Sequence, residues 1–426
     1  MAIDNKDKKV LKSSIEREQN EVACSAECEK IKGSKNLNVP HLRFPEFSGE
    51  WKKCIIQDYG EVITGNTPPT NNAEYYNNGS YLWASPADLG TGKKINDTKT
   101  KLSESGFKKT RIIPKGSILV TCIGSTIGKM GMAVETMSSN QQINSIIVNE
   151  KSNNDFVYYA ISRAFPRYLS EVGVQAVPIL SKSNFEKLPN YTTSIEEQDK
   201  TGYFLNLLDE RIATQNKIID KLKSLIKGLI DDIITLECGL LVTFETLYSK
   251  AGEGGTPTTS NMEFYDNGNI PFIKIEDLNN KYLLTNKDYI TELGLKKSSA
   301  WLIPTNSIIY SNGATIGAIS INKYPICTKQ GILGIIPNSN IDVEYLYYFM
   351  RSSYFQKEVE RIVTEGTMKT AYLKDINHIK CPIPDSDKQK EISHALSTLS
   401  LKEDIENQLL KKYQIQKQYL LSQMFI

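Results

Sequence analysis

GNTPPTNNAEYYNNG at residues 65–79 and GGTPTTSNMEFYDNG at residues 254–268 are two versions of one sequence, and this repeat decides the fold. The offset between them is 189 residues (268 − 79). GSTIG at residues 124–128 returns at the same offset as GATIG at residues 313–317. Solenoid repeats recur every roughly 20–50 residues, so this much longer period predicts two related domains in tandem.

Each copy ends in a segment typical of the start of a helix. Ser194-Ile-Glu-Glu and Ser386-Asp-Lys-Gln both match the capping box. In a capping box a serine and an acidic or amide side chain three residues later satisfy the free N–H groups of the first turn. The sequence therefore predicts a long helix after each domain.

Apolar residues follow both boxes at steps of three and four, the heptad pattern of a coiled coil. The seam residues are Leu205, Leu208, Ile212, Ile219, Leu222, Ile226 and Leu229 in the first run and Ile392, Leu396, Leu399, Leu410 and Tyr413 in the second. Polar residues interrupt the runs at Gln215, Glu403, Glu406 and Lys417. A helix of about 40 residues is on the order of 60 Å long, which exceeds the reach of one domain. We therefore expect the two helices to pair as an antiparallel coiled coil that spaces the domains and leaves apolar surface for other proteins.

Short β-rich runs separated by turn residues fill the rest of each copy, together with one amphipathic helical pattern. This predicts an α+β fold in which two pseudo-symmetric domains alternate with two long helices. The expected segments are a mobile polar arm at residues 1–38, a first domain at 39–193, a first long helix at 194–239, a second domain at 240–385 and a second long helix at 386–426.

The composition is that of a folded protein with little net charge. Hydrophobic residues make up 40%, and 51 Lys and Arg against 49 Asp and Glu leave a formal charge of +2, so a nucleic-acid-binding surface must be local. The seven cysteines are scattered and odd in number, and the three histidines share no metal-ligand spacing. This favours reduced thiols in a cytoplasm and no metal site. No secretory signal or membrane span is apparent.

A local positive charge lies at residues 93–115, where eight Lys or Arg against two Asp or Glu give +6 (8 − 2). Such a run is usually a solvated face, but it also suits the phosphate backbone of a nucleic acid. Its first two cations are Lys93 and Lys94. The groups suited to reading base edges are carried by Asn140, Gln141, Gln142, Lys329 and Gln330.

GSTIGK at residues 124–129 invites a nucleotide-binding interpretation that its spacing does not support. A P-loop has four residues between its glycines and then Lys-Ser or Lys-Thr, whereas this loop has three and then Lys129-Met. The second copy has Ala318 in the place of Lys129. We therefore expect a glycine-containing hairpin loop, with Ser125, Thr126 and Lys129 as ligand contacts. No other catalytic constellation is apparent, so we expect a non-catalytic chain.

VPHLRFPEFSGEW at residues 39–51, the two repeated stretches, both GxTIG loops and both serine-capped long helices resemble the specificity subunit of type I restriction-modification enzymes. The resemblance covers residues 39–426 and departs only at the N-terminal arm. It implies two target-recognition domains, each reading one half of a bipartite DNA sequence, with the paired helices as a ruler. Half-sites separated by on the order of one helical turn are expected.

The resemblance also implies partners and cofactors. Two modification subunits bind S-adenosylmethionine and methylate the exocyclic amine of adenine, while restriction subunits use ATP and Mg²⁺ for DNA translocation and cleavage. The chain lacks the Asp/Asn-Pro-Pro-aromatic motif of such methyltransferases, since its single Pro-Pro, at residues 68–69, lies in Thr-Pro-Pro-Thr. We therefore expect this chain to bind none of these cofactors itself and to work in a prokaryotic cytoplasm.

Matching the loops to this family implies DNA contacts in both domains. They are Ser125, Thr126, Lys129, Asn140, Gln141 and Gln142 in the first domain and Asn312, Thr315, Lys329 and Gln330 in the second. Two rival interpretations stay open at this point. One is a coiled-coil interaction scaffold without a DNA target, against which the basic segment argues, and the other, more remote, is a P-loop-like nucleotide-binding enzyme.

Overall fold

The computed structural model describes residues 38–172, 179–236, 239–313, 315–363 and 369–426. These form two compact units. Unit 1 comprises the described residues up to Glu210 together with Ile415–Ile426, and unit 2 comprises Arg211–Gln414. The expected arm at residues 1–38 lies outside the described residues except for Asn38.

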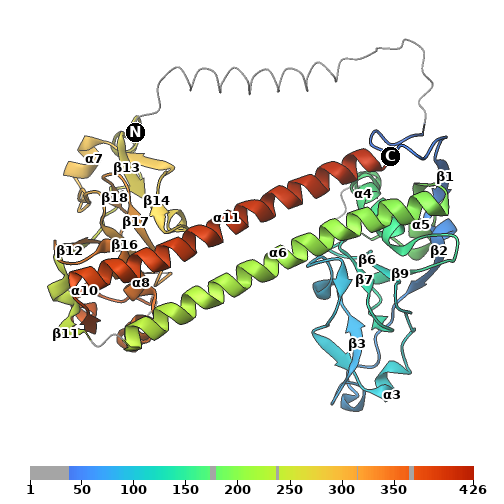
Figure 1. Cartoon of the computed structure of the whole chain (residues 1–426), viewed down its shortest axis with the longest axis horizontal. Coiled ribbons are helices and arrows are strands. Elements are labelled where there is room, and N and C mark those ends of the chain that lie inside the picture. Colours follow the sequence, from blue (N-terminus) through green and yellow to red (C-terminus); the bar gives the residue numbers. More distant parts are fainter. Residues whose placement is uncertain (1–37, 173–178, 237–238, 314, 364–368) are drawn as a thin grey trace, which may run out of the picture. The chain divides into compact units, whose positions relative to one another are not determined.

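Unit 1 contains a five-stranded sheet with strand order β2-β9-β6-β7-β4, a three-stranded sheet with order β5-β3-β8, and the strand pair β1-β10 (Figure 1). The strands are β1 (Lys52–Ile55), β2 (Gly60–Thr64), β3 (Tyr81–Ala84), β4 (Lys94–Ile95), β5 (Thr100–Leu102), β6 (Ile118–Thr121), β7 (Met130–Ala133), β8 (Ser138–Ser139), β9 (Ile143–Val148) and β10 (Pro189–Thr192). The helices before the first long helix are α2 (Ile56–Tyr59), α3 (Glu104–Phe107), α4 (Asn154–Val172) and α5 (Lys182–Glu186).

Unit 2 repeats this topology strand for strand, with sheets β12-β19-β16-β17-β14, β15-β13-β18 and β11-β20. Its strands are β11 (Leu240–Thr243), β12 (Tyr248–Glu253), β13 (Ile270–Ile273), β14 (Tyr282–Leu283), β15 (Asp288–Ile290), β16 (Ile308–Ser311), β17 (Ile319–Asn322), β18 (Cys327–Thr328), β19 (Ile332–Pro337) and β20 (Lys380–Ile383). Its shorter helices are α7 (Glu292–Lys296), α8 (Val343–Arg351), α9 (Ser353–Ile362) and α10 (Leu373–Ile376). The predicted tandem pair of α+β domains is confirmed.

The repeated stretch forms the same turn in both units. The hydroxyl of Tyr76 donates to the carbonyl of Pro68 at 2.7 Å, and the hydroxyl of Tyr265 donates to the carbonyl of Pro257 at 2.6 Å. Each bond closes a loop in which the two partners are eight residues apart. The repeat is therefore visible in the sequence because the turn places a tyrosine hydroxyl at a fixed spacing from the backbone carbonyl that accepts it.

Two long helices, α6 (Ile195–Leu236) and α11 (Ser386–Met424), follow the domains. The hydroxyl of Ser194 accepts the N–H of Glu197 at 3.4 Å. The Glu197 carboxylate accepts a hydrogen bond from Arg43 and not from the backbone N–H of Ser194, as a capping box would require. At α11 the cap is Asp385, one residue before the predicted serine, and it accepts the N–H of Lys388 at 2.9 Å. The helix starts were therefore predicted correctly to within a residue, while neither capping box forms as expected.

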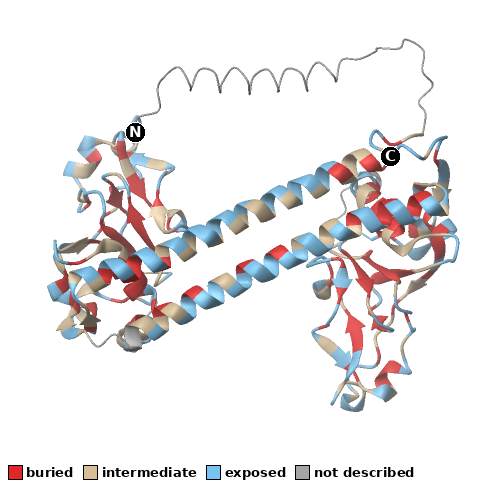
Figure 2. Cartoon of the chain, in the orientation of Figure 1, coloured by how far each residue is buried: buried red, intermediate tan, exposed pale blue. Residues whose placement is uncertain are grey.

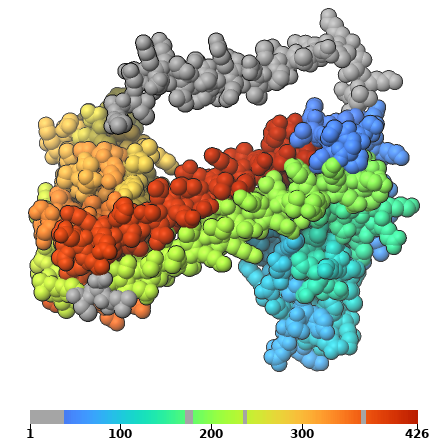
Figure 3. Space-filling model, in the orientation of Figure 1, coloured from blue at the N-terminus to red at the C-terminus, as the bar shows by residue number. Residues whose placement is uncertain are grey.

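The helices pair in opposite directions within each unit, as expected of an antiparallel coiled coil. In unit 2, where the two helices lie side by side (Figure 3), Gln215 donates to the carbonyl of Glu406 at 3.2 Å. In the same unit Arg211 donates to the hydroxyl of Tyr413 at 3.1 Å. All the predicted seam residues are buried or half-buried, and Ile230, which was not predicted, is buried with them.

The buried residues lie inside each unit (Figure 2). In unit 1 the core packs α4 and the five-stranded sheet against Leu205 of α6 and against Leu420, Met424 and Phe425 at the end of the chain. The Phe425 ring lies 5.8 Å from that of Trp51. In unit 2 the equivalent core includes Ile226 and Ile392 from the two long helices. Each domain is therefore completed by residues from both long helices.

Candidate nucleic-acid interface

The loop between β6 and β7 and the residues before β9 together hold most of the residues predicted to contact DNA in the first domain. Strands β6 and β9 are antiparallel, with Thr121 opposite Ile143, so the loop after β6 lies beside the residues that precede β9. Together they border an open pocket of about 620 Å³. Its lining residues are Ser85, Pro86, Ala87, Ile123, Gly124, Ser125, Thr126, Lys129, Asn140 and Gln142.

Two glycines give this loop its shape. Gly124 and Gly128 have φ of 97° and 91°, in the left-handed region that other residues avoid. A Cβ at Gly128 would lie 2.7 Å from the ring of Phe165, so the loop also approaches the core too closely for a side chain there. The tight turn leaves Ser125 and Lys129 exposed. The expected glycine-containing hairpin loop is confirmed.

Asn140 and Gln142 form one hydrogen-bonded unit at the edge of the pocket. The Asn140 amide donates to the Gln142 side chain at 3.1 Å and accepts the Gln142 backbone N–H at 3.0 Å. Asn140 is buried, so its role is to orient Gln142. Among the described residues no acceptor is bonded to the Gln142 side-chain nitrogen, which is therefore left for a ligand. Gln141, exposed next to it, accepts the hydroxyl of Thr67 at 2.5 Å.

Lys129 carries the charge of the pocket. Its side chain runs over Gly90, where a Cβ would come within 3.1 Å of the lysine methylenes. None of the ion pairs in the described part of the chain involves Lys129. An exposed ammonium beside amide donors and a serine hydroxyl is an arrangement suited to a phosphate next to base edges.

Several of the lysines in the basic segment at residues 93–115 form ion pairs within the chain. Lys94, Lys101 and Lys108 are each paired with a carboxylate, at 3.3, 2.9 and 2.6 Å. The prediction that Lys93 contacts DNA assumed an exposed side chain, and this assumption is wrong. Lys93 is buried, 7% exposed, and its ammonium lies 2.5 Å from the Asp155 carboxylate.

The second domain has the corresponding loop between β16 and β17. Asn312, predicted as a contact, is 1% exposed and donates to the carbonyl of Ala371 at 3.2 Å, so it is a structural residue. Thr315, Lys329 and Gln330 are exposed. Since Ser311 pairs with Ile332, the loop and residues 329–330 lie at the same end of the sheet, and their DNA contacts stay predictions.

Sequence reasoning missed the residues that form the third side of the pocket, Ser85, Pro86 and Ala87. Asp88 fixes this turn by accepting the backbone N–H and the hydroxyl of Ser85, at 2.9 and 2.7 Å. Asp277 makes the same backbone contact in unit 2, to Lys274 at 2.9 Å. Asp88-Leu89 and Asp277-Leu278 are 189 positions apart, the offset of the repeat, and this recurrence was the available signal for the turn.

The geometry excludes the P-loop interpretation. In a P-loop the glycine-rich turn connects a strand to a helix whose N-terminus faces the phosphates. Here the turn connects β6 to the antiparallel strand β7. No group of three or more His, Cys, Asp or Glu in the described part of the chain is arranged to hold a metal ion. The described cysteines, Cys54, Cys122, Cys327 and Cys381, are unpaired thiols.

A family model described as the type I restriction modification DNA specificity domain matches residues 48–224 and 249–413, one match for each copy. The chain belongs to this family. The EcoR124I/EcoR124II specificity subunit of Escherichia coli is 31% identical over 174 residues, which is 39% of this chain and 43% of that protein, less than two thirds of its length. The MjaVIII specificity subunit of Methanocaldococcus jannaschii is 24% identical over 88% of this chain and 91% of its own.

The fold is also similar to that of a solved specificity-family protein. The crystal structure of the type I restriction-modification system S subunit from M. genitalium has a TM-score of 0.58 and 17% identity, covering 91% of this chain and 99% of that one. At this identity the likeness concerns the fold. Over the residues that the structure describes, no helix has both the length and the apolar content needed to cross a membrane.

Proposed function

We propose that this chain is the DNA-recognition subunit of a type I restriction-modification complex, in which each domain reads one half of a bipartite target. The observation that carries the proposal is the pocket at the β6–β7 loop, where Ser125, Thr126, Lys129 and Gln142 converge. The same loop recurs in the second domain of the duplicated chain. Two similar surfaces suit a target of two parts.

The residues of the pocket divide by chemistry. Lys129 supplies a point charge for a phosphate, which gives affinity without sequence information. The side chain of Gln142 offers an amide group that pairs with base edges in the major groove, as does Gln141, which lies next to Gln142 in the chain but does not line the pocket. Ser125 and Thr126 donate or accept at either position. The buried Asn140 holds Gln142 in place for this contact.

The chain acts with other subunits in this proposal. Two modification subunits carry S-adenosylmethionine and transfer the methyl group to adenine, and restriction subunits carry ATP and Mg²⁺. This chain contributes recognition and no catalysis, and the complex works in the cytoplasm of a prokaryote. The paired helices set the distance between the half-sites, and the seam residues, from Leu205 to Tyr413, support the docking of the modification subunits. The specificity subunits to which the chain is similar support the recognition role within a type I restriction enzyme.

The proposal is tested by expressing the chain with the modification subunit encoded beside it in a host that lacks adenine methylation. Single-molecule sequencing then maps methylated adenines. A new split motif with a fixed unspecified gap is the expected result. An assembled complex that neither methylates DNA nor binds any duplex in preference to others would refute the proposal and favour an interaction scaffold.

A further inference from the structure

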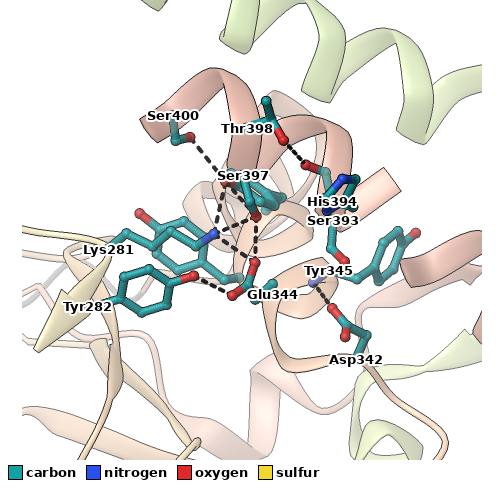
Figure 4. Close-up of polar contacts among 12 residues, drawn as sticks. Lys281, Tyr282, Asp342, Glu344, Tyr345, Ser393, His394, Ser397, Thr398 and Ser400 are labelled. Atoms are coloured by element: carbon teal, nitrogen blue, oxygen red, sulfur yellow. Dashed lines mark hydrogen bonds and ion pairs between the residues drawn. The ribbon is translucent and has the colours of Figure 1, made fainter. Parts of the chain in front are cut away.

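A half-buried lysine joins three elements of unit 2. The ammonium of Lys281, just before β14, donates to the carboxylate of Glu344 on α8 at 2.9 Å and to the hydroxyl of Tyr348 at 3.1 Å. It also donates to the hydroxyl of Ser397 on α11 at 2.7 Å. Figure 4 shows these contacts converging on the lysine nitrogen. One side chain thus connects the sheet of the recognition domain to the long helix.

The surroundings of this Lys281 cluster (Lys281, Glu344, Tyr348 and Ser397) fix the lysine further. Its side chain is 13% exposed, and its nitrogen lies 4.7 Å from the centre of the Tyr348 ring and 4.9 Å from that of Tyr282. The hydroxyl of Tyr282 donates to Glu344. Each polar atom around the lysine is therefore engaged with another member of the cluster.

Unit 1 contains the same arrangement around Lys93, the residue that the sequence had suggested as a DNA contact. Its ammonium lies 2.5 Å from Asp155 on α4, 2.9 Å from the side-chain oxygen of Asn206 on α6, and 3.2 Å from the hydroxyl of Tyr159. The lysine side chain is 3% exposed. These residues form the Lys93 cluster (Lys93, Asp155, Tyr159 and Asn206).

The two clusters correspond residue by residue. The lysines are 188 positions apart (281 − 93), the tyrosines 189 (348 − 159) and the acids 189 (344 − 155). The long-helix residues, Asn206 and Ser397, are 191 apart (397 − 206). The chain therefore places a lysine with little exposed surface between domain and helix in both copies, although the helix residue that accepts its hydrogen bond has changed from an amide to a hydroxyl.

Joining two elements through a buried lysine costs free energy, because the charged ammonium is desolvated. Burial lowers the pKa of Lys93 more than the hydrogen bond to Asp155 restores it. Burial also lowers the pKa of Lys281, but hydrogen bonds to Tyr348 and Glu344 outweigh it, so this pKa lies above its ordinary value. Apolar residues of similar volume are often as stabilising as a buried ion pair. Apolar residues do not supply a directional contact, whereas a displacement of the long helix by one turn, about 5.4 Å, would break the bond from Lys93 to Asn206 or from Lys281 to Ser397.

We propose that Lys93 and Lys281 fix the orientation of each recognition domain on its long helix and thereby set the number of unspecified base pairs between the half-sites. This inference rests on the proposed function. Both lysines are positioning residues that do not contact DNA. Replacing one should therefore relax the preferred gap and leave the base preference of each half-site unchanged.

The test compares complexes that contain full-length wild-type chain, Lys281→Met or Lys250→Met. Lys250 is the matched control, since it is an exposed lysine on β12, at the opposite edge of the same sheet from β14. Methylation is measured on duplexes that carry the two half-sites with the native gap, one base pair fewer or one base pair more. Lys281→Met should reduce the preference for the native gap by roughly tenfold, as expected for losing a hydrogen bond to a charged group, and Lys250→Met should not.

A wild-type gap preference in Lys281→Met, or an equal loss of methylation at every gap, would overturn the inference, because the lysine would then serve stability alone. Ser397→Ala, which removes one hydroxyl from the cluster, provides a second variant should Lys281→Met not assemble, and the same relaxation is expected from it. Failure of the proposed function is recognised separately, since the wild-type complex would then methylate none of the duplexes.

Discussion

Replacing Lys129 by alanine tests whether the β6–β7 loop lies against DNA. The ammonium is exposed, borders the pocket together with Ser125 and Gln142, and is not part of the ion pairs of the described residues. Its methylenes cover Gly90 but bury little apolar surface. The substitution should therefore leave folding unchanged and remove one positive charge from the interface.

The expected magnitude follows from counterion release. One phosphate contact contributes about 0.9 to the slope of log K against log salt, which amounts to roughly 3.5-fold in affinity between about 50 and 200 mM salt. Binding of the assembled complex to its target duplex, measured by fluorescence anisotropy at four or more salt concentrations, gives this slope. Lys129→Ala should lower it by about one unit, and should weaken binding to all sequences alike.

Lys151→Ala is the matched control. Lys151 is also exposed, but it follows β9 at Val148, the end of the strand opposite to Ile143 and the pocket. This variant should keep the wild-type slope. An unchanged slope in Lys129→Ala, or an equal fall in both variants, would refute the placement of DNA at the loop.

Three further outcomes follow from the structure. Gly65→Ala should lower the unfolding free energy of unit 1 by roughly 1–3 kcal/mol, an overpacking cost, because its Cβ would lie 2.3 Å from the carbonyls of Ser139 and Asn140. Gly92→Ala, where a Cβ meets nothing within 4 Å, should change it little in the same denaturant titration. Burial raises the pKa of Glu197, but hydrogen bonds from Arg43, Thr193 and Trp51 outweigh it and hold the pKa below 4.5. The stabilisation is thus present above pH 4.5 and is lost as pH falls through the lowered pKa. Glu197→Gln should therefore cost about 3 kcal/mol at pH 7 and show a smaller loss on acidification than wild type; equal acid dependence of the two proteins would contradict this. Replacing residues 39–190 by the equivalent part of a relative should change one half-site in the methylation map, and a change in both would contradict two separate readers.

The domain pair and the long helices could be predicted because their signals are local or repeated. Heptads such as Leu205 and Leu208 follow from the geometry of one helix, and the tyrosine of each repeated turn finds its proline eight residues away. No knowledge of distant contacts was needed. The helix ends were less accurate, since Glu197 binds Arg43, 154 positions earlier, and so leaves the box that its spacing suggested.

The misinterpreted residues all owe their role to partners far away in the sequence. Lys93 resembles a surface cation until Asn206, 113 residues later, is placed beside it. Three of the four polar residues that interrupt the heptads, Gln215, Glu406 and Lys417, have the same explanation. Gln215 donates to Glu406, 191 positions away, and Lys417 lies 2.5 Å from Asp209. Buried polar pairs of this kind specify the register of a coiled coil, so interruptions that weaken the seam in sequence are contacts across it in the structure.

The core of unit 1 includes Leu420, Met424 and Phe425. The domain that is synthesised first can therefore complete its core only after unit 2 has been synthesised. The roughly 200 residues of Arg211–Gln414 must be made first, which takes about 10–40 s at roughly 5–20 residues per second. During that time the nascent first domain exposes the rings of Trp51 and Phe156 that Phe425 later covers. A stop codon shortly before Leu420 would therefore damage the first-made domain and spare the second, the reverse of what the position of the lesion suggests.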